Sequence, residues 1–295
     1  MIKQTIMLTS PVSLSLKNKQ LVISFKDSDD IATRPIEDIG FVVVENQRVS
    51  FTVPALNELV DNNVSVIFCD SKNMPKSMLM NLDGNTTLQE SYKYQIEATQ
   101  PTKKRLWKQL IESKIRNQSR VLDYVGKNGD VLKQYYMNVK SGDTDNREGI
   151  ASKVYWNNLF GKDFKRDRDG GAPNNFLNYG YSLLRAATAR AIIGSGLYPA
   201  FGIFHRNRYN AFPLADDIME PYRPFVDEII YRLYYDSAED ELNNNVKTKL
   251  LRVLFSDVKM GKVTRPLEIA LSMTTASLLK IYKGEETDLM LPVLV

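Results

Sequence analysis

The spacing of apolar residues changes once along this chain, and that change constrains the fold more than any other feature. Early in the chain, apolar residues alternate with mostly polar ones on both sides of residues 17–20, a pattern typical of a β-hairpin. Short apolar runs at 39–45 and 65–69 have the composition of buried strands, and residues 54–61 between them resemble a short helix. The first part of the chain is therefore predicted to be rich in β-strands.

The period lengthens to about 3.6 residues after the turn-forming run Asp83-Gly84-Asn85-Thr86-Thr87. The helical candidates that follow are residues 88–125, 131–140, 145–160, 174–195, 217–236, 239–255 and 266–282. Residues 174–195 are apolar on most faces and rich in alanine, so they are expected to form a buried central helix. We predict an α+β protein with a β-rich domain over residues 1–83 and a larger helical domain over residues 84–295.

Composition restricts the class of protein but does not choose its function. The net charge of +4 over 295 residues permits a polyanionic partner without requiring one. Cys69 is the single cysteine, which excludes an intrachain disulfide and a thiolate zinc cluster and favours a reducing compartment. Residues 1–8 lack the features of a signal peptide, and the longest weakly polar stretch, 191–204, is interrupted by glycine and proline. We expect a soluble cytoplasmic protein that does not enter a membrane.

A candidate metal site surrounds His205, the one histidine of the chain. Any imidazole ligand or base must be this residue. Asp216, Asp217 and Glu220 follow within fifteen residues. On a helix Asp217 and Glu220 would share one face, where two negative charges repel unless a divalent cation joins them. Carboxylates with an imidazole suit Mg²⁺ or Mn²⁺.

Structural roles for the same residues remain open at this point. Asp217 could be a helix N-cap with Glu220 as its capping-box partner, and His205 could be a hydrogen-bonded structural histidine. Asp145 and Glu148 have the same cap spacing before an amphipathic run. From spacing alone, capping is the better interpretation of Glu148.

Basic clusters are candidates for contacts with DNA phosphates. They comprise Lys103, Lys104, Arg105 and Lys108; Lys162, Lys165, Arg166 and Arg168; and Arg206 and Arg208. Arg206 and Arg208 lie near the acidic cluster formed by Asp216, Asp217 and Glu220. Their positive charge would offset the repulsion between these carboxylates and DNA phosphates. We also expect phosphate contacts from Lys162, Lys165 and Arg166. The chain has neither a Gly-Lys-Ser/Thr phosphate loop nor a Gly-x-Ser-x-Gly elbow, which disfavours nucleotide hydrolysis and a serine hydrolase of that type.

Four segments in a fixed order make the chain similar to a known family. They are Gly142-Asp143-Thr144-Asp145-Asn146-Arg147-Glu148-Gly149, Leu177-Asn178-Tyr179-Gly180-Tyr181, Gly202-Ile203-Phe204-His205, and Leu214-Ala215-Asp216-Asp217-Ile218-Met219-Glu220-Pro221-Tyr222. With these segments the chain resembles the CRISPR-associated spacer-acquisition integrases, the Cas1 family, in the form of type II systems.

The resemblance implies a fold and a catalytic site. It implies a β-sandwich-like N-terminal domain followed by a helical catalytic domain. It also implies that Glu148, His205 and Glu220 bind Mg²⁺ or Mn²⁺ and are catalytic, with Asp217 as a further acidic residue near them. Substitution of Glu148, His205 or Glu220 by alanine is then expected to abolish activity without unfolding the protein.

The resemblance further implies a reaction and its partners. The 3′-hydroxyl of a captured DNA fragment would attack a phosphodiester at the edge of a CRISPR repeat, and water in its stead would make the protein an endonuclease. A homodimer is expected, with two dimers bridged by a small second adaptation protein on double-stranded DNA. The alternatives are a catalytically silent DNA-binding scaffold and a general metal-dependent repair nuclease.

Overall fold

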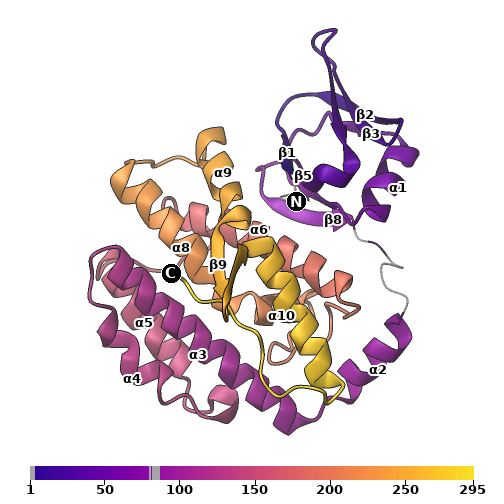
Figure 1. The fold of residues 1–295 in the computed structure, drawn as a ribbon. Helices are drawn as coiled ribbons and strands as arrows, with labels where there is room; N and C mark the ends of the chain where they lie inside the picture. Colours follow the sequence, from indigo (N-terminus) through magenta and orange to yellow (C-terminus); the bar gives the residue numbers. More distant parts are fainter. Residues whose placement is uncertain (1–3, 80, 82–86) are drawn as a thin grey trace. The chain divides into compact units, whose positions relative to one another are not determined.

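The computed structural model describes residues 4–79, 81 and 87–295 (Figure 1). The chain divides into two compact units, Met1–Thr86 and Thr87–Val295. The predicted boundary between residues 83 and 84, and most of the turn predicted there, lie outside the described residues. Among the helices of residues 4–79, 81 and 87–295, none combines the length and the apolar composition that a membrane span requires.

Two four-stranded sheets form the N-terminal unit. The first has the order β1 (Gln4–Leu8), β5 (Ile39–Val44), β7 (Ser65–Cys69) and β8 (Pro75–Leu79). The second has the order β4 (Ile31–Pro35), β3 (Gln20–Phe25), β2 (Val12–Lys17) and β6 (Ser50–Phe51). Strand β5 is buried along its whole length because it lies inside its sheet, between β1 and β7.

A single hydrophobic core joins the two sheets with helix α1 (Val53–Asp61). Leu14 and Ile23 enter it from the second sheet, Val42 and Val66 from the first, and Leu59 from α1. The predicted hairpin is confirmed: β2 and β3 are antiparallel, and they are joined by a two-residue turn at Asn18 and Lys19, both with positive φ. This core accounts for the alternating pattern in the sequence.

The second unit is mainly helical. Its α-helices are α2 (Leu88–Glu97), α3 (Gln100–Tyr124), α4 (Lys133–Tyr136), α5 (Arg147–Phe160), α6 (Asn174–Gly194), α7 (Pro213–Ile218), α8 (Arg223–Tyr231), α9 (Asn244–Leu251) and α10 (Leu267–Tyr282). Short 3₁₀ segments add Gly129–Leu132, Ser141–Asp143, Glu220–Tyr222 and Arg252–Phe255, and Arg232–Asp236 is a π-helix. The predicted α+β class, with a β-rich region followed by a larger helical one, is confirmed.

Helix α6 lies at the centre of this unit, as predicted. It packs against α7, α8, α9 and α10, and most of its side chains are buried. At Gly180 a Cβ atom would lie 2.5 Å from Val226 Cγ1 of α8, so the glycine permits the close approach of the two helices. A helix in this position holds α7 and α8, and with them the acidic cluster, against the core.

Several predicted helices are interrupted. The segment 88–125 is two helices, because Thr99 caps α3 by accepting a hydrogen bond from the backbone N–H of Thr102 and because Pro101 lies in the first turn of α3. The segment 217–236 begins inside α7 and restarts twice around Pro221 and Pro224. The segment 239–255 was predicted as one helix. In the structure the helix begins at Asn244, and the 3₁₀ segment Arg252–Phe255 follows it.

One element of the second unit was not predicted. Strands β9 (Asp257–Met260) and β10 (Val263–Pro266) form an antiparallel hairpin before α10. The unit is therefore helical with one short hairpin, not purely helical. The strands are four residues each, too short for their alternation to be recognised in the sequence.

Candidate active site

Two carboxylates that are distant in the sequence converge on one buried lysine. Lys114 Nζ, on α3, lies 2.5 Å from Glu148 Oε1 and 2.6 Å from Glu220 Oε2. Glu148 lies in the first turn of α5 and Glu220 at the start of the 3₁₀ segment after α7. The exposed fraction is 8% for the Lys114 side chain, 7% for Glu220 and 31% for Glu148. The predicted pair Glu148 and Glu220 is thus brought together by an unpredicted cation.

The charges around Glu220 keep this group ionised. Arg223 Nε lies 2.9 Å from Glu220 Oε1. Burial disfavours the charged form of Glu220, but Arg223 and Lys114 outweigh it and hold the pKa of the carboxyl below its usual value. The positive charge of Lys114 likewise lowers the pKa of Glu148, against the effect of burial. Both carboxylates are therefore anionic at neutral pH.

Asp217 holds the imidazole of His205 and the loop before it. Asp217 Oδ2 accepts hydrogen bonds from the backbone N–H groups of Ile203 and Phe204, at 2.6 and 3.0 Å. Asp217 Oδ1 accepts from the backbone N–H of His205 at 3.2 Å and faces its Nδ1 at 2.6 Å. These four bonds occupy the acceptor positions of a carboxylate, so Asp217 orients His205 instead of facing a cation itself.

The fold of this loop depends on Gly202. A Cβ atom at residue 202 would lie 2.6 Å from the carbonyl oxygen of His205 and 3.0 Å from Asp217 Oδ2. The hydrogen bond to Asp217 is the main cause of a raised pKa of His205, which burial partly opposes. With Nδ1–H directed at Asp217, the Nε2 atom of the imidazole keeps its lone pair for another partner.

The proposed capping roles of the acidic residues are wrong. Asp217 lies inside α7, whose N-cap is Phe212, so it caps no helix. The N-cap of α5 is Asn146, whose side chain accepts a hydrogen bond from the backbone N–H of Gly149. Glu148 turns away from the backbone and contacts Lys114, and it accepts a hydrogen bond from Ser152 Oγ at 2.9 Å.

Helix α3 contacts the candidate site through two of its side chains, Lys114 and Trp107. Trp107, two turns before Lys114, meets the His205 ring edge to face at 5.7 Å between centroids. Glu220 contributes to the raised pKa of His205, so its charge acts on the imidazole. Lys114 itself could have been noticed, because it interrupts the apolar stripe that Trp107, Leu110 and Ile111 begin.

The donor atoms suit a divalent cation, although they are not gathered around one position. Within residues 4–79, 81 and 87–295, no three His, Cys, Asp or Glu side chains form a ligand group. Lys114 stands between the two glutamates, and buried Glu220 Oε2 has no hydrogen bond of acceptable geometry. Carboxylate oxygens with an imidazole nitrogen are donors that Mg²⁺ and Mn²⁺ accept, so the residues fit such an ion.

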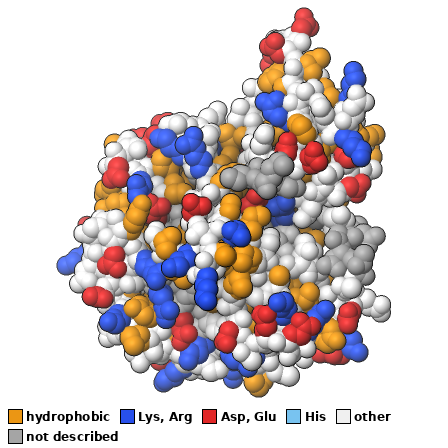
Figure 2. Space-filling model, viewed as in Figure 1, with side chains coloured by type: hydrophobic (Ala, Val, Ile, Leu, Met, Phe, Trp, Pro, Cys, Tyr) orange, Lys and Arg blue, Asp and Glu red, His pale blue; other side chains and the backbone are white. Residues whose placement is uncertain are grey.

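The residues predicted to contact phosphates differ in exposure and in whether their side chains already form hydrogen bonds. Arg206 follows His205 and donates to Gln100 Oε1 at 2.9 Å, while the guanidinium of exposed Arg208 lies over the ring of Tyr209. Lys162 and Lys165 are exposed. Arg166 is already engaged, because its guanidinium donates to Asn174 Oδ1 at 3.0 Å and to Asn178 Oδ1 at 2.7 Å. Figure 2 shows Lys and Arg intermixed with Asp and Glu over the helical unit, in keeping with the modest net charge.

A further buried carboxylate, Asp227, is connected to the site through Tyr181 and Arg223. Asp227 accepts hydrogen bonds from the hydroxyls of Tyr155, at 2.9 Å, and Tyr181. The guanidinium of Arg223 lies 4.6 Å from the centre of the Tyr181 ring, on its way to Glu220. No signal in the sequence distinguishes buried Asp227 from the exposed acidic residues near it.

Asp227 should make stability depend on pH. Burial raises its pKa from 3.8 to about 6, although both tyrosine hydroxyls and Arg223 favour the charged form. Between about pH 4 and 6 the folded protein then binds more protons than the unfolded chain, so the free energy of unfolding falls as the pH rises. In Asp227→Asn this contribution disappears, and the variant should gain roughly 3 kcal/mol on wild type across that window.

Urea unfolding at pH values from 4 to 7 measures this difference. Asp130→Asn, at an exposed carboxylate, is the matched control, and its profile should run parallel to that of wild type. Parallel profiles for Asp227→Asn and wild type would show that Asp227 titrates like an exposed carboxyl.

Comparison with known proteins shows which family this chain resembles over most of its length. A family model described as CRISPR associated protein Cas1 matches residues 6–265. The CRISPR-associated endonuclease Cas1 of Neisseria meningitidis serogroup C is 35% identical over 252 residues, which cover 84% of this chain and 82% of that protein.

Solved structures share the fold. A chain of a casposase bound to an integration product superposes with a TM-score of 0.81 at 20% identity, covering 98% of this chain and 92% of the other. A chain of a Cas6-RT-Cas1–Cas2 complex has a TM-score of 0.74 at 19% identity, covering 98% of this chain and 36% of the other. From the match over most of its length and the identity to a curated relative, the chain belongs to the Cas1 family of CRISPR-associated proteins.

Proposed function

We propose that this protein is a divalent-metal-dependent DNA integrase and endonuclease of CRISPR adaptation, which joins the 3′-hydroxyl ends of captured DNA fragments to the CRISPR repeat by transesterification. The observation that carries this proposal is the convergence of Glu148 and Glu220 beside a histidine that a buried carboxylate orients. Such carboxylate and imidazole sites are suited to phosphodiester chemistry.

We assign a different role to each group of residues in the site. Glu148, Glu220 and Nε2 of His205 would hold Mg²⁺ or Mn²⁺, and the ion would supply positive charge to polarise the phosphoryl oxygens of the substrate. Asp217 fixes the tautomer and the direction of the His205 ring. Lys114 and Arg223 balance the negative charge of the two glutamates and hold them in place. Basic residues that flank His205, Arg206 first, would draw the phosphate backbone towards these groups.

The family match supports a proposal for the partners. We propose that the protein acts as a homodimer on double-stranded DNA and that two dimers are bridged by the small second adaptation protein. The similar chain in a Cas6-RT-Cas1–Cas2 complex supports such a partner, and the casposase on its integration product supports DNA as the substrate.

A strand-transfer assay tests the function. The protein and its small partner are incubated with a labelled fragment that carries 3′-hydroxyl ends and with a duplex containing the repeat. Joined product is expected with Mn²⁺ or Mg²⁺, none with EDTA, and none from a fragment with 3′-phosphate ends. Duplex binding without any metal effect on product or on melting temperature would support the scaffold alternative. Cleavage without preference for the repeat would support a general nuclease.

Asp217→Asn should lower the affinity for Mn²⁺ or the rate of transfer by about 10- to 100-fold, the usual cost of losing a residue that orients a ligand. The amide would either direct its NH₂ group at the N–H groups of Ile203 and Phe204 or direct it at His205 Nδ1. In the first orientation the hydrogen bonds that hold the loop at Ile203 and Phe204 are lost. In the second, Nδ1 accepts a hydrogen bond, so the proton of the neutral imidazole moves to Nε2, the atom proposed to bind metal.

Calorimetric Mn²⁺ titration and transfer kinetics measure this effect. The control is Asp216→Asn, on the same helix, because Asp216 pairs with Arg185 at 2.7 Å and, among the described residues, forms no hydrogen bond with His205. Unchanged Mn²⁺ affinity and transfer in Asp217→Asn, or equal losses in both variants, would contradict an orienting role.

A further inference from the structure

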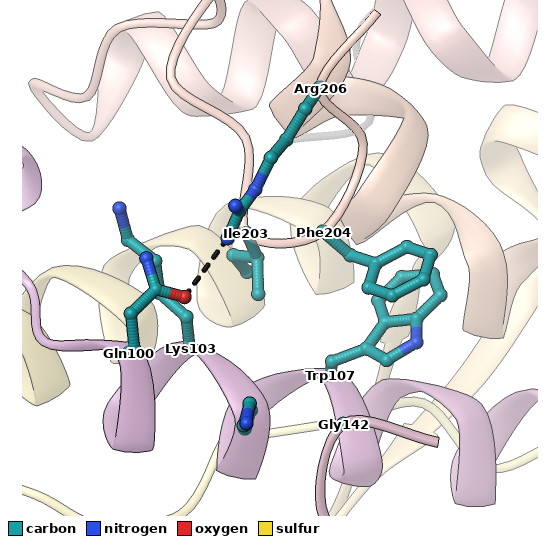
Figure 3. Close-up of a pocket in the computed structure, with 8 residues that line it drawn as sticks. Gln100, Lys103, Trp107, Gly142, Ile203, Phe204 and Arg206 are labelled. Carbon is teal, nitrogen blue, oxygen red and sulfur yellow. Dashed lines mark hydrogen bonds between the residues drawn. The ribbon is translucent and has the colours of Figure 1, made fainter. Parts of the chain in front are cut away.

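Helix α3 carries two sets of side chains with different partners. One set borders the candidate site: Trp107, whose ring is stacked on Phe204 (Figure 3), and Lys114. The second set lies on a neighbouring face and consists of polar residues three or four positions apart, Gln109, Ser113, Asn117 and Arg120. These side chains bind residues 287–294, which we call the C-terminal segment, the yellow trace that leads from the end of α10 to the C-terminus (Figure 1).

The C-terminal segment is held by its backbone. Asn117 Oδ1 accepts a hydrogen bond from the N–H of Leu294 at 3.1 Å, and Arg120 donates one to the carbonyl oxygen of Leu294 at 2.9 Å. Two backbone hydrogen bonds, of 2.9 and 3.2 Å, join Val293 to Lys259 of β9. The segment therefore has a fixed position against α3.

Asn117 connects this segment to the residue after Glu220. Its side chain is buried, and Nδ2 donates to two carbonyl oxygens, that of Pro221 at 2.9 Å and that of Pro292 at 3.0 Å. Both N–H groups of the amide are used in this way, and Oδ1 is occupied by Leu294. A single buried amide thus ties the backbone next to Glu220 to the C-terminal segment.

A second connection begins at Tyr222, in the same 3₁₀ segment as Glu220. The hydroxyl of Thr274, on α10, donates to the carbonyl oxygen of Met290 at 2.6 Å. A hydroxyl has one proton, so Thr274 Oγ1 accepts from the hydroxyl of Tyr222, which lies 2.7 Å away. Tyr222 and Thr274 are fully buried. Both residues that follow Glu220 are therefore linked to the C-terminal segment.

The 3₁₀ segment Glu220–Tyr222 needs such support. It is three residues long, and Pro221 has no N–H with which to bind the preceding turn. Lys114 and Arg223 hold the carboxylate of Glu220, but they do not fix its backbone. A shift of this backbone would leave buried polar groups without partners, which is costly.

We propose that Asn117 and Thr274 are positioning residues for Glu220, and that the C-terminal segment, which both of them bind, is part of the frame that holds this carboxylate in place for the metal. The inference rests on the proposed function, in that Glu220 is taken as a metal ligand. It goes beyond that function because it assigns a role in metal binding to residues near the end of the chain that do not contact the ligands.

Thr274→Val tests the second connection. The substitution keeps the shape of the side chain and removes the hydroxyl between Tyr222 and Met290. The affinity for Mn²⁺, measured by calorimetry, should fall about tenfold, at the lower end of the loss usual for residues that orient a ligand.

Thr275→Val is the matched control. Thr275 is the next residue of α10, is equally buried, and donates to the carbonyl oxygen of Ala191 in α6. Both variants should lose stability in EDTA, but Thr275→Val should bind Mn²⁺ as tightly as wild type. Wild-type affinity in Thr274→Val, or an equal loss in both variants, overturns the proposal.

Asn117→Leu and Gln109→Leu form a second pair on α3. Each loses a hydrogen bond to the C-terminal segment, but only Asn117 also binds Pro221. Asn117→Leu should bind Mn²⁺ about tenfold more weakly, and Gln109→Leu should bind it like wild type. If the leucine variant does not fold, Asn117→Ser takes its place. A folded variant at residue 117 with wild-type affinity overturns the role of Asn117.

Hydrogen exchange tests the C-terminal segment itself. Coupling between two sites is reciprocal, so a metal that requires Glu220 in place should also stabilise this segment. Mn²⁺ should slow exchange of the backbone N–H groups of Met290 and Leu294 by about tenfold in wild type and in Thr275→Val, but not in Thr274→Val. Unchanged exchange in a wild-type protein that binds Mn²⁺ overturns the role of the segment.

A measurement without metal separates this inference from the proposed function. Urea unfolding in EDTA gives the unfolding equilibrium constants of Thr274→Val, Glu220→Gln and the double variant. Their effects should deviate from independence by about tenfold, as for residues in one network, whereas Thr275→Val and Glu220→Gln should act independently. Independent effects of Thr274→Val and Glu220→Gln contradict this inference alone, and a wild-type protein that binds no Mn²⁺ contradicts the proposed function alone.

Discussion

His205→Ala and Glu148→Gln should each reduce strand transfer by more than about 100-fold, because loss of a residue that merely orients a ligand already costs about 10- to 100-fold. Both variants should stay folded. The His205 side chain is 41% exposed, and Asp217 keeps its bonds to three backbone N–H groups without it. Glu148 is 31% exposed, and a glutamine of the same shape still accepts a hydrogen bond from Ser152.

Transfer kinetics with Mn²⁺ measure the loss, and melting temperatures in EDTA establish that the fold survives. Ser152→Ala is the matched control, since it removes one neutral hydrogen bond to Glu148 and should cost less than about tenfold, in line with the ~1 kcal/mol of such a bond. Undiminished transfer by His205→Ala and Glu148→Gln would refute the assignment of the site.

Glu220 requires a different experiment from the one the sequence suggests. Its side chain is 7% exposed and contacts both Lys114 and Arg223, so Glu220→Ala would leave two cations without their partner. Removing one member of a buried ion pair costs about 3–5 kcal/mol. A loss of activity in Glu220→Ala would therefore mix unfolding with loss of a ligand, contrary to the expectation that the fold stays intact.

Lys114→Met should lower the free energy of unfolding by about 3–5 kcal/mol in EDTA, the second large effect we expect. Without the ammonium, Glu148 loses its ion pair and Glu220 keeps the one with Arg223, so the two carboxylates repel each other in a largely buried position. For a unit of this size the melting temperature should fall by roughly 10 °C. Mn²⁺ should restore much of the loss, because a cation between the two carboxylates can take over the role of Lys114.

Thermal unfolding with EDTA and with a series of Mn²⁺ concentrations measures both parts of this prediction. Lys108→Met is the control, because Lys108 on the same helix pairs with Glu112 at 3.6 Å on the surface and should contribute under about 1 kcal/mol. If Lys114→Met is as stable as wild type and gains no more from Mn²⁺ than wild type does, Lys114 does not balance the two glutamates.

Local signals in the sequence were sufficient for elements whose pattern is long or whose turn is distinctive. The alternation around Asn18 and Lys19 predicted the β2–β3 hairpin, and the apolar, alanine-rich run predicted α6. They were insufficient where prolines or short caps divide a periodic stretch, as at Thr99 and around Pro221. Periodicity averages over several turns of helix and does not register a break of one or two residues.

The sequence by itself determined the family, the α+β class and the three segments that carry Glu148, His205 and Glu220. The order of the motifs and the hydrophobic period can be recognised in the sequence without information on tertiary contacts. Only the tertiary structure decided that Asp217 orients His205, that Lys114 joins Glu148 to Glu220, and that Asp227 is buried behind them. The reason is physical: burial and charge pairing depend on which distant residues meet, and neither is contained in the local spacing of residues along the chain.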